Sequence, residues 1–401
     1  MGVRIPPRVL KIKVMKIDID KIKQIPKEIS EEFGMCVYGP ISDEIKAWME
    51  FHGMQSQNMG NYTNIYTDKN IIDLFNKPEP FEYIDGFSPN LNKNLHIGHF
   101  SNLVLAKAFV SLGIAKKTVA ILGDTLEGDV SKEDALNNYN EICEKFSYPV
   151  DKMFMASEME SDYNLVDGVH EYEGTKVFYL DTPLVGIKSD GSTTYFYQDV
   201  ALAQKLNAPT LYLTGSEQNG HFNSLKEMFP KIKHIGLGLV KAKGGKMSSR
   251  LGNVIWMQDV IDEMMSNFQD EKVCYNVFAG FILKSTPKSE KNIDIYQLDN
   301  PLNSPGLYLS YTLAKLKSAG VKCEGKTFTS QDLQFKYMKA LNSLSPNILL
   351  EGLIDHAKKI SGLYITHKIK DNAVNQSMFE ILGSDLLLGM SLLGLFDVDK
   401  V

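Results

Sequence analysis

Long apolar segments are missing from this sequence of 401 residues, and no stretch approaches the length that crosses a membrane. The first residues, Met1 to Val14, include basic side chains but lack the continuous apolar core and the cleavage site of a secretory signal. Cysteine is scarce, and no two of the four cysteines have the spacing of zinc ligands or of a redox-active pair. We therefore expect reduced thiols, a cytoplasmic location, no membrane segment and no metal held by the protein.

A surplus of positive charge is missing as well. The chain has 43 Lys and Arg residues against 49 Asp and Glu residues, a net charge of −6. Contacts to phosphates require local Lys and Arg, so the overall charge does not point to a nucleic-acid-binding protein, although a basic stripe on an acidic body remains compatible with it. The length predicts two or three domains, and a hydrophobic content of 43% is typical of globular proteins.

The pattern of apolar residues divides the chain into three regions. Residues 1–77 are typical of a small α/β module, and the helix breakers of Asn76–Pro80 indicate a linker after it. Residues 78–296 alternate strands with helices, which favours a doubly wound, mostly parallel sheet of the Rossmann type. Its strands are predicted at Phe81–Ile84, Thr118–Leu122, Thr210–Leu213 and His234–Val240, and its helices at Ile97–Leu112, Val200–Leu206 and Phe222–Met228.

Strands are not expected after about Met257. Helical periodicity follows, and residues 297–401 are predicted to form a C-terminal helical bundle. Its helices are predicted at Leu307–Ser318, Leu333–Leu344, Ile348–Leu363 and Met378–Leu393. The predicted fold class is therefore α/β, with a Rossmann-type catalytic domain, a small N-terminal module and a helical C-terminal domain.

A first signature, S-P-N-L-N-K-N-L-H-I-G-H, occupies Ser88–His99 between a predicted strand and a predicted helix. The first turn of a helix offers unpaired N–H groups and a positive dipole end, which suit a phosphate. His96 and His99 share one face of that turn and can both donate to a phosphate. Gly98 leaves room for a nucleotide to approach the backbone, and Lys93 adds positive charge. Taken alone, H-I-G-H favours the alternative of a helix start with two surface histidines.

A second signature, G-K-M-S-S-R-L-G-N-V, occupies Gly245–Val254 in a stretch rich in glycine and lysine. Lys246 and Arg250 can neutralise triphosphate charge, and the hydroxyls of Ser248 and Ser249 can hydrogen-bond to it. Glycines around these residues would allow the loop to close over a substrate. Taken alone, the segment favours the alternative of an exposed basic turn.

Together and in this order, the two segments resemble the signatures of class I aminoacyl-tRNA synthetases, and the longer spelling of the first is similar to that of the arginine enzymes. Other similar segments are S-D-G-S-T-T-Y-F-Y-Q-D-V-A (Ser189–Ala201), G-S-E-Q-N-G-H-F (Gly215–Phe222), G-L-Y-L-S-Y-T-L-A-K (Gly306–Lys315) and G-N-Y-T-N-I-Y (Gly60–Tyr66). The resemblance spans nearly the whole chain. It implies an arginine–tRNA ligase that uses ATP with its Mg²⁺, arginine and tRNA(Arg), and we expect it to act as a monomer.

The resemblance also implies which residues form the sites for ATP and arginine. Catalysis is assigned to His96, His99, Lys93, Lys246 and Arg250, and ATP binding to His96, Gly98, His99, Lys246, Met247, Ser248 and Ser249. Arginine binding is assigned to Asp85, Ser88, Asn90, Glu160, Tyr195, Asp199 and Gln218. Carboxylates and neutral acceptors suit a guanidinium, which is planar and charged and carries five donors. The alternative for Asp199 is an ordinary helix N-cap.

Two sets of residues are implied to contact tRNA. Asn61, Tyr62 and Asn64 would contact its elbow, from residues 1–77. Tyr308, Tyr311 and Lys315 would meet the anticodon loop from the helical domain, because exposed aromatic rings beside a cation stack on unpaired bases. The alternative is that the two tyrosines belong to an apolar stripe in the core of the bundle.

Several features depart from the family's pattern. Only about 36 positions separate Asp124 from Glu160, where the family carries a longer insertion, and the spelling G-D-T-L-E-G-D is unusual there. Arg250 stands in place of a second lysine, Lys315 where the family often has arginine, and Val401 where it often has methionine. Two alternatives stay open: an enzyme that activates arginine for an acceptor other than tRNA, and a tRNA-binding protein without catalytic activity.

Overall fold

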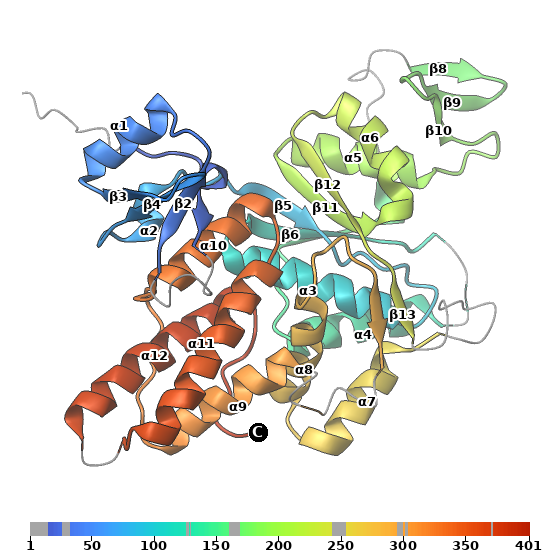
Figure 1. The fold of residues 1–401 in the computed structure, drawn as a ribbon. Helices are drawn as coiled ribbons and strands as arrows, with labels where there is room; N and C mark the ends of the chain where they lie inside the picture. The colour runs from blue at the N-terminus through green and yellow to red at the C-terminus, as the bar shows by residue number, and fades with distance from the viewer. Residues whose placement is uncertain are drawn as a thin grey trace, which may run out of the picture.

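A five-stranded parallel sheet forms the centre of the fold (Figure 1). The chain runs outward from the central strand to one edge of the sheet and then crosses back to the other side of that strand, as in a doubly wound fold. The computed structural model describes residues 15–25, 33–125, 128, 130–159, 169–242, 254–294, 300, 304–369 and 372–401. In spatial order the strands are β12 (Ile232–Leu237), β11 (Thr210–Gly215), β5 (Phe81–Asp85), β6 (Ala115–Leu122) and β7 (Lys152–Met155), and neighbouring strands are parallel.

Helices cover both faces of this sheet because its inner strands are apolar on both sides. Ile84 and Leu211 belong to a core shared with α3 and α4, whereas Tyr83 and Tyr212 belong to a second core shared with α5 and α6. Burial on both faces is the expected state of parallel strands. The predicted Rossmann-type fold class is confirmed. The covering helices are α3 (Ile97–Leu112), α4 (Lys132–Lys145), α5 (Tyr195–Leu206) and α6 (Asn219–Met228).

One predicted strand is wrong. His234–Val240 was expected to be continuous, but β12 ends at Leu237 and a separate strand, β13 (Val240–Ala242), leaves the central sheet. The chain separates from the sheet at Gly238, where the backbone of Ser289 approaches closely. A side chain at position 238 would place its Cβ 2.1 Å from the carbonyl oxygen of Ser289. β13 pairs in parallel with β14 (Lys291–Ile293), so the expectation that no strand follows Met257 is also wrong.

A small antiparallel sheet between β7 and α5 was not predicted. It contains β8 (Val169–Tyr172), β9 (Thr175–Phe178) and β10 (Leu184–Ile187). Figure 1 shows it at the edge of the molecule, beyond α5 and α6. Most of the residues of these strands are exposed or half-buried, so they lack the regular apolar alternation by which a strand is recognised in a sequence.

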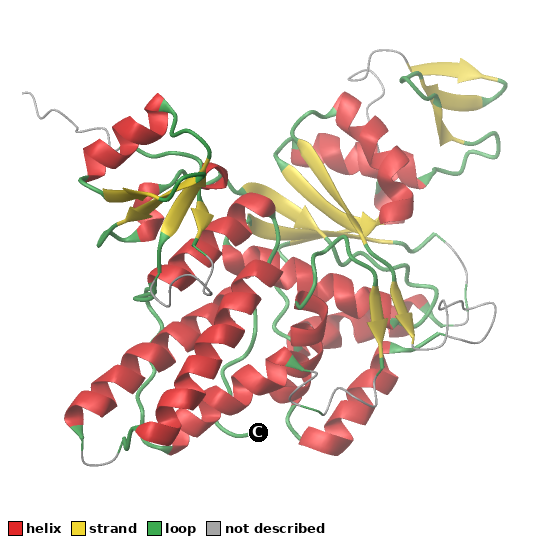
Figure 2. Ribbon diagram, viewed as in Figure 1, coloured by secondary structure: helices red, strands yellow, loops and turns green. Residues whose placement is uncertain are grey.

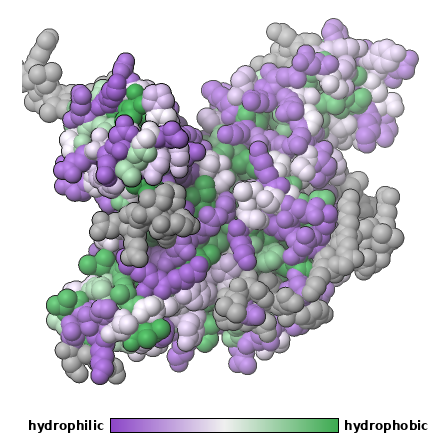
Figure 3. Space-filling model, viewed as in Figure 1, coloured by the Kyte–Doolittle hydropathy of each residue, from purple (hydrophilic) through white to green (hydrophobic). Residues whose placement is uncertain are grey.

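The N-terminal region is an α/β module, as predicted. Its antiparallel sheet packs against α1, where Trp48 is fully buried and donates from Nε1 to the carbonyl oxygen of Leu74, 3.1 Å away. In Figure 3, hydrophilic side chains cover most of the visible face of the module. Its elements are β1 (Lys23–Gln24), β2 (Met35–Tyr38), α1 (Asp43–His52), β3 (Gln55–Asn58), β4 (Tyr62–Tyr66) and α2 (Ile71–Leu74).

Residues 304–369 and 372–401 form helices joined by loops, as predicted, and the helices lie side by side in Figure 2. The backbones of α8 and α9 approach closely at Gly306. A side chain there would place its Cβ 1.7 Å from the carbonyl oxygen of Asn276. Among the described residues, no helix combines the length and the apolar character needed to span a membrane. The helices are α7 (Met257–Phe268), α8 (Glu271–Leu283), α9 (Pro305–Ser318), α10 (Gln331–Ser343), α11 (Asn347–Thr366) and α12 (Ala373–Leu392).

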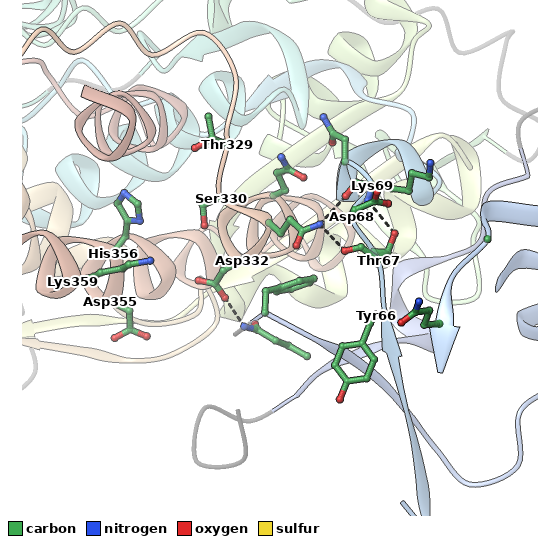
Figure 4. A pocket seen from close by; sticks show the side chains of 17 residues that line it. Tyr66, Thr67, Asp68, Lys69, Thr329, Ser330, Asp332, Asp355, His356 and Lys359 are labelled. Atoms are coloured by element: carbon green, nitrogen blue, oxygen red, sulfur yellow. Dashed lines mark hydrogen bonds between the residues drawn. The ribbon is translucent and has the colours of Figure 1, made fainter. Parts of the chain in front are cut away.

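Glutamine side chains join the N-terminal module to the helical region. Gln331 donates from Nε2 to the carbonyl oxygens of Thr67 and Lys69, at 3.1 and 2.9 Å, and Gln334 accepts from the amide of Ile71 at 2.7 Å. Beside these contacts lies a cavity of 1170 Å³, lined by polar residues of the module, by the start of α10 and by the middle of α11 (Figure 4). These polar contacts add to apolar packing, in which Phe335 of the helical region meets Phe33 and Phe75 of the module.

Candidate active site

A cleft of 680 Å³ opens at the carboxyl ends of β5 and β11. These two strands flank the point where the chain reverses its direction across the sheet, which is where doubly wound folds bind ligands. The walls contain residues from the first signature, from α5, and from the segment between β11 and α6. The sequence-predicted residues in the cleft are Asp85, Ser88, Asn90, Lys93, His96, Gly98, His99, Tyr195, Asp199 and Gln218.

The two histidines of the first signature are locked together at the start of α3. His96 is the N-cap, and its Nδ1 accepts from the amide of Gly98 at 3.1 Å. His99 reaches back, and its Nδ1 accepts from the amide of His96 at 3.2 Å. The two rings stack with centroids 3.8 Å apart. This arrangement is a capping box built from two imidazoles, and it fixes both rings against the first turn.

These contacts also determine the protonation of the rings. A neutral imidazole whose Nδ1 accepts a hydrogen bond carries its proton on Nε2. Burial and the positive charge of Lys93 lower the pKa of His96 to about 4, and burial with the neighbouring His96 lowers the pKa of His99 well below its usual value. At neutral pH both rings are therefore uncharged, and each has an Nε2–H free of the capping contacts.

The structure gives a reason for glycine at position 98 that differs from the expected one. A Cβ at this position would lie 2.9 Å from Cε1 of His96 and 3.0 Å from its Nδ1. A side chain would therefore push on the stacked imidazole, whereas the sequence suggested only that glycine leaves room for a nucleotide. Lys93 is exposed at the mouth of the cleft.

Residues 245–253 of the second signature lie outside the residues that the structure describes, and these include Lys246, Met247, Ser248, Ser249 and Arg250. Described residues before and after this segment lie close to the cleft and to the first signature. Val240 lines the cleft, and the carbonyl oxygen of Ile255 accepts from the amide of Ile97 at 3.0 Å. The amide of Met257 donates to the carbonyl oxygen of Leu95 at 2.9 Å.

Asp85 ends the central strand β5 and lies at the bottom of the cleft. The hydroxyl of Ser88 donates to its carboxylate and accepts from the amide of Ile121 at 3.1 Å. Burial raises the pKa of Asp85 to about 7, the hydrogen bond from Ser88 opposes that shift, and the negative charge of Asp199 adds to it. A buried carboxyl group that titrates near neutrality in a cleft is a frequent mark of a functional site.

Asn90 is held against the sheet by the backbone on both sides of it. The amide of Leu91 donates to the carbonyl oxygen of Gly123 at 2.7 Å, and the amide of Gly123 donates to that of Pro89 at 3.1 Å. A Cβ at position 123 would lie 1.9 Å from Oδ1 of Asn90, so a residue larger than glycine would displace the Asn90 side chain. The Nδ2 of Asn90 points across the cleft to the hydroxyl of Tyr195, 3.4 Å away.

Asp199 lies one helical turn after Tyr195 on α5, so both side chains face the cleft. The alternative that Asp199 caps a helix is excluded, because α5 begins at Tyr195 and Thr194 is its N-cap. Gln218 is exposed in the wall after β11. Glu160 lies outside the described residues.

His221, a residue of the cleft that sequence reasoning missed, contacts Asp199. Its Nε2 lies 2.6 Å from Oδ2 of Asp199. The residue stands in G-S-E-Q-N-G-H-F, a segment that was singled out for other positions, and nothing in the sequence indicates that it meets Asp199 in space.

The expected tRNA contacts differ in exposure. Asn61 is exposed and Tyr62 half-buried, but Asn64 is only 4% exposed, and its Oδ1 has no hydrogen-bond partner within the described part of the chain. Its Nδ2 donates to the hydroxyl of Tyr66 at 3.2 Å.

The two tyrosines of α9 do not behave alike. Tyr311 is 53% exposed, whereas Tyr308 is half-buried against the core, with its hydroxyl 3.1 Å from the Ser361 hydroxyl. The expectation that both rings face outward is therefore met by Tyr311 only. Lys315 is half-buried, and its Nζ lies 4.1 Å above the ring of Tyr364.

The chemistry available in the cleft is binding and electrostatic stabilisation. Neutral N–H donors and an exposed lysine suit a phosphate, and the carboxyl groups of Asp85, Asp199 and Glu217 suit a cation. Within the described ranges, no group of three or more His, Cys, Asp or Glu side chains is placed to hold a metal ion.

The pKa of Asp85 leads to a first testable prediction. Its pKa in the folded protein is about 7 and its usual value is 3.8, so the folded state retains a proton that the unfolded chain releases between these values. The stability from this proton is complete below about pH 4 and is lost as the pH rises through about 7, at about 1.4 kcal/mol per pKa unit. Asparagine cannot ionise, so Asp85→Asn should gain melting temperature relative to wild type between pH 5 and pH 8. A difference that does not change with pH would contradict the burial of an ionisable Asp85.

Comparisons with known proteins find similarity to arginine enzymes. The family model described as the catalytic domain of tRNA synthetases class I (R) matches residues 141–275. The arginine–tRNA ligase of Lactobacillus johnsonii is 26% identical over 270 residues, which are 55% of this chain and 48% of that protein. For the arginine–tRNA ligase of Limosilactobacillus reuteri the identity is 25% over 319 residues, 64% of this chain and 57% of that protein. The matched part thus spans about half the length of these curated relatives.

Solved structures share the fold. The arginyl-tRNA synthetase of Thermus thermophilus superposes with a TM-score of 0.67 at 14% identity, over 95% of this chain and 96% of that chain. The arginyl-tRNA synthetase of Plasmodium falciparum gives a TM-score of 0.67 at 13% identity, over 95% and 94% of the two chains. The family model, the sequence relatives and these structures together agree with the resemblance seen in the two signatures: the chain is similar in sequence to arginine–tRNA ligases and in fold to arginyl-tRNA synthetases.

Proposed function

We propose that this chain is an arginine–tRNA ligase, which activates arginine with ATP and transfers it to tRNA(Arg). The observation that carries the proposal is the composition of one cleft. The fixed Nε2–H donors of His96 and His99 lie in the same cleft as the carboxylates of Asp85 and Asp199. Donors for a triphosphate and acceptors for a guanidinium are the two sets of groups that activation of arginine needs.

In the first step, the carboxylate of arginine attacks the α-phosphorus of ATP, and the bond to pyrophosphate breaks. The products are arginyl-adenylate and pyrophosphate, and Mg²⁺ accompanies ATP as part of the substrate. The chain contributes positioning and stabilisation of charge, not a nucleophile. His96, Gly98, His99, Lys93 and the second signature, with Lys246, Met247, Ser248, Ser249 and Arg250, are assigned to ATP. Asp85, Ser88, Asn90, Glu160, Tyr195, Asp199 and Gln218 are assigned to arginine.

In the second step, a terminal ribose hydroxyl of tRNA attacks the adenylate carbonyl, and AMP leaves. Residues 1–77 are assigned to the tRNA elbow through Asn61, Tyr62 and Asn64, residues 78–296 to catalysis, and residues 297–401 to the anticodon through Tyr308, Tyr311 and Lys315. The four free cysteines fit the proposal that the enzyme works in the cytoplasm, and we propose that it acts as a monomer.

The direct test is charging of tRNA by the purified protein. Incubated with ATP, Mg²⁺, total tRNA and one labelled amino acid at a time, the protein should form acid-precipitable, ribonuclease-sensitive product with arginine alone. Label that resists ribonuclease would favour an acceptor other than tRNA. The absence of product with every amino acid would contradict the proposal.

The different exposure of the two tyrosines gives a prediction about tRNA. Stacking on a base is worth about 1–3 kcal/mol, so Tyr311→Ala should lower kcat/KM for tRNA by about 5- to 150-fold. Because Tyr311 is 53% exposed, the melting temperature should stay close to that of wild type. Tyr308→Ala provides a comparison, since it removes a half-buried ring and should lower the melting temperature more than Tyr311→Ala does. Unchanged charging by Tyr311→Ala would remove this residue from the tRNA-binding surface.

A further inference from the structure

The contact between His221 and Asp199 is the feature of the cleft that the proposed roles do not use. Nε2 of His221 lies 2.6 Å from Oδ2 of Asp199, and both side chains line the cleft. We propose that His221 is a positioning residue of the arginine site: it holds the Asp199 carboxylate in the orientation that receives the guanidinium. This inference rests on the proposed function, because it takes Asp199 as the acceptor of the substrate side chain.

The direction of the hydrogen bond is fixed by chemistry. An ionised carboxylate only accepts, so Nε2 of His221 must carry the proton and donate it to Oδ2. The bond therefore uses one oxygen of Asp199 and fixes the plane of the carboxylate, while Oδ1 keeps its acceptor capacity. A guanidinium offers several N–H donors in one plane, and a carboxylate of fixed orientation binds such a group without first losing rotational freedom.

The imidazole itself is held in place by aromatic side chains. The ring of Phe196 meets it edge-on, with centroids 5.2 Å apart, and the ring of Phe222 lies 4.9 Å away. Phe196 is only 4% exposed and Phe222 only 3%, so neither can move without disturbing the core. His221 is thus a donor on a rigid support, as a positioning residue needs to be.

The carboxyl group of Asp85 explains why Asp199 needs a fixed donor. Asp85 ends β5 in the same cleft, and the charge of Asp199 contributes to the raised pKa of Asp85. Two carboxylates that repel each other favour orientations that point apart when no cation is bound. The donor on His221 opposes that movement and keeps Asp199 ready for the substrate. A site with acceptors in fixed positions also disfavours a side chain whose donors do not match them, such as the ammonium of lysine.

The test separates positioning from a purely structural role by comparing three variants. His221→Leu removes the donor, whereas His221→Gln places an amide N–H near the position of Nε2. His234→Gln is the matched control: His234 also stacks on Phe222, with centroids 4.3 Å apart, but it hydrogen-bonds to Thr214 and is not among the residues that line the cleft. Arginine-dependent ATP–pyrophosphate exchange, with tRNA present, gives KM for arginine, KM for ATP and kcat, and the melting temperature reports folding.

We expect His221→Leu to raise KM for arginine by about 10- to 100-fold, the effect of losing one hydrogen bond to a charged group. KM for ATP and kcat at saturating arginine should stay within about threefold of wild type, because the phosphate site is untouched. His221→Gln should restore most of the affinity, and His234→Gln should leave KM for arginine unchanged.

Two results would overturn the inference. One is an unchanged KM for arginine in a folded His221→Leu variant. The other is equal impairment of the Leu and Gln variants with matching losses of melting temperature, which is what a structural role predicts. If wild-type protein shows exchange with arginine, either result refutes only the role of His221. If wild-type protein shows no exchange with arginine, the proposed function fails and the inference fails with it.

Discussion

Asparagine in place of His96 or His99 is expected to lower the rate of adenylate formation by about two orders of magnitude while the protein stays folded. The reason is that each imidazole presents one Nε2–H from a fixed ring, and loss of one such donor costs about 3 kcal/mol of transition-state stabilisation. Asparagine is chosen because its Oδ1 can replace Nδ1 as the acceptor of the capping contacts, and it is among the best N-cap residues. Alanine at position 96 would also remove the cap, so its effect would mix folding with catalysis.

The measurement is the single-turnover rate of adenylate formation at saturating ATP and arginine, with the melting temperature as a control for folding. The pH dependence of the wild-type rate provides a second check. Burial lowers the pKa of both histidines, to about 4 for His96, so the wild-type rate should not fall as the pH drops from 8 to 6 through protonation of these rings. A folded variant with the wild-type rate would remove the histidines from the phosphate site.

Asp199→Asn is expected to raise KM for arginine by about 30-fold to several thousand-fold, since removing one member of a hydrogen-bonded charge pair costs about 2–5 kcal/mol. The substitution keeps the size of the side chain but removes the charge that a guanidinium requires. It also places an amide beside His221, whose Nε2 lies 2.6 Å from Oδ2 in the wild type. kcat at saturating arginine should fall less than kcat/KM.

The control for this prediction is Asp190→Asn in the neighbouring turn. Asp190 is exposed, accepts from the amide and hydroxyl of Ser192, and is not among the residues that line the cleft. It should leave KM for arginine unchanged. Equal effects of the two substitutions, or no effect of Asp199→Asn, would show that Asp199 does not receive the substrate.

Local sequence patterns predicted the central fold well. Helix α3 runs over Ile97–Leu112 as expected, because its apolar residues recur at helical spacing and Gly113 provides a left-handed C-cap with φ of 81°. The strands β5 and β11 were found because they are short apolar runs, typical of buried parallel strands.

The misses have physical causes that do not show in a local pattern. The break between β12 and β13 depends on the close approach of Ser289 to Gly238, a contact between segments about 50 positions apart. The strands β8 to β10 are largely solvent-exposed and carry no clear alternation. Helix α5 begins five residues before its predicted start because Thr194, not Asp199, provides the cap.

The candidate site was predicted as a set of residues but not as an arrangement. The first signature predicted that His96 and His99 belong to the site. The stacking of their rings and their joint capping of α3 depend on backbone contacts that the spacing of the two residues does not specify. His221 was missed because it meets Asp199 only after α5 and α6 are packed. Tyr308 and Tyr311 look equivalent in the sequence, and only the packing of α9 against α11 distinguishes them.

The central claim, that this cleft activates arginine, is tested most directly by ATP–pyrophosphate exchange across the standard amino acids, with and without tRNA. The account predicts that arginine is the only amino acid that supports exchange. The family resemblance further implies that this exchange requires bound tRNA. Asp199→Asn and His99→Asn should each reduce it, the first through KM for arginine and the second through the rate. Exchange driven by another amino acid, or none with arginine when tRNA is present, would contradict the account.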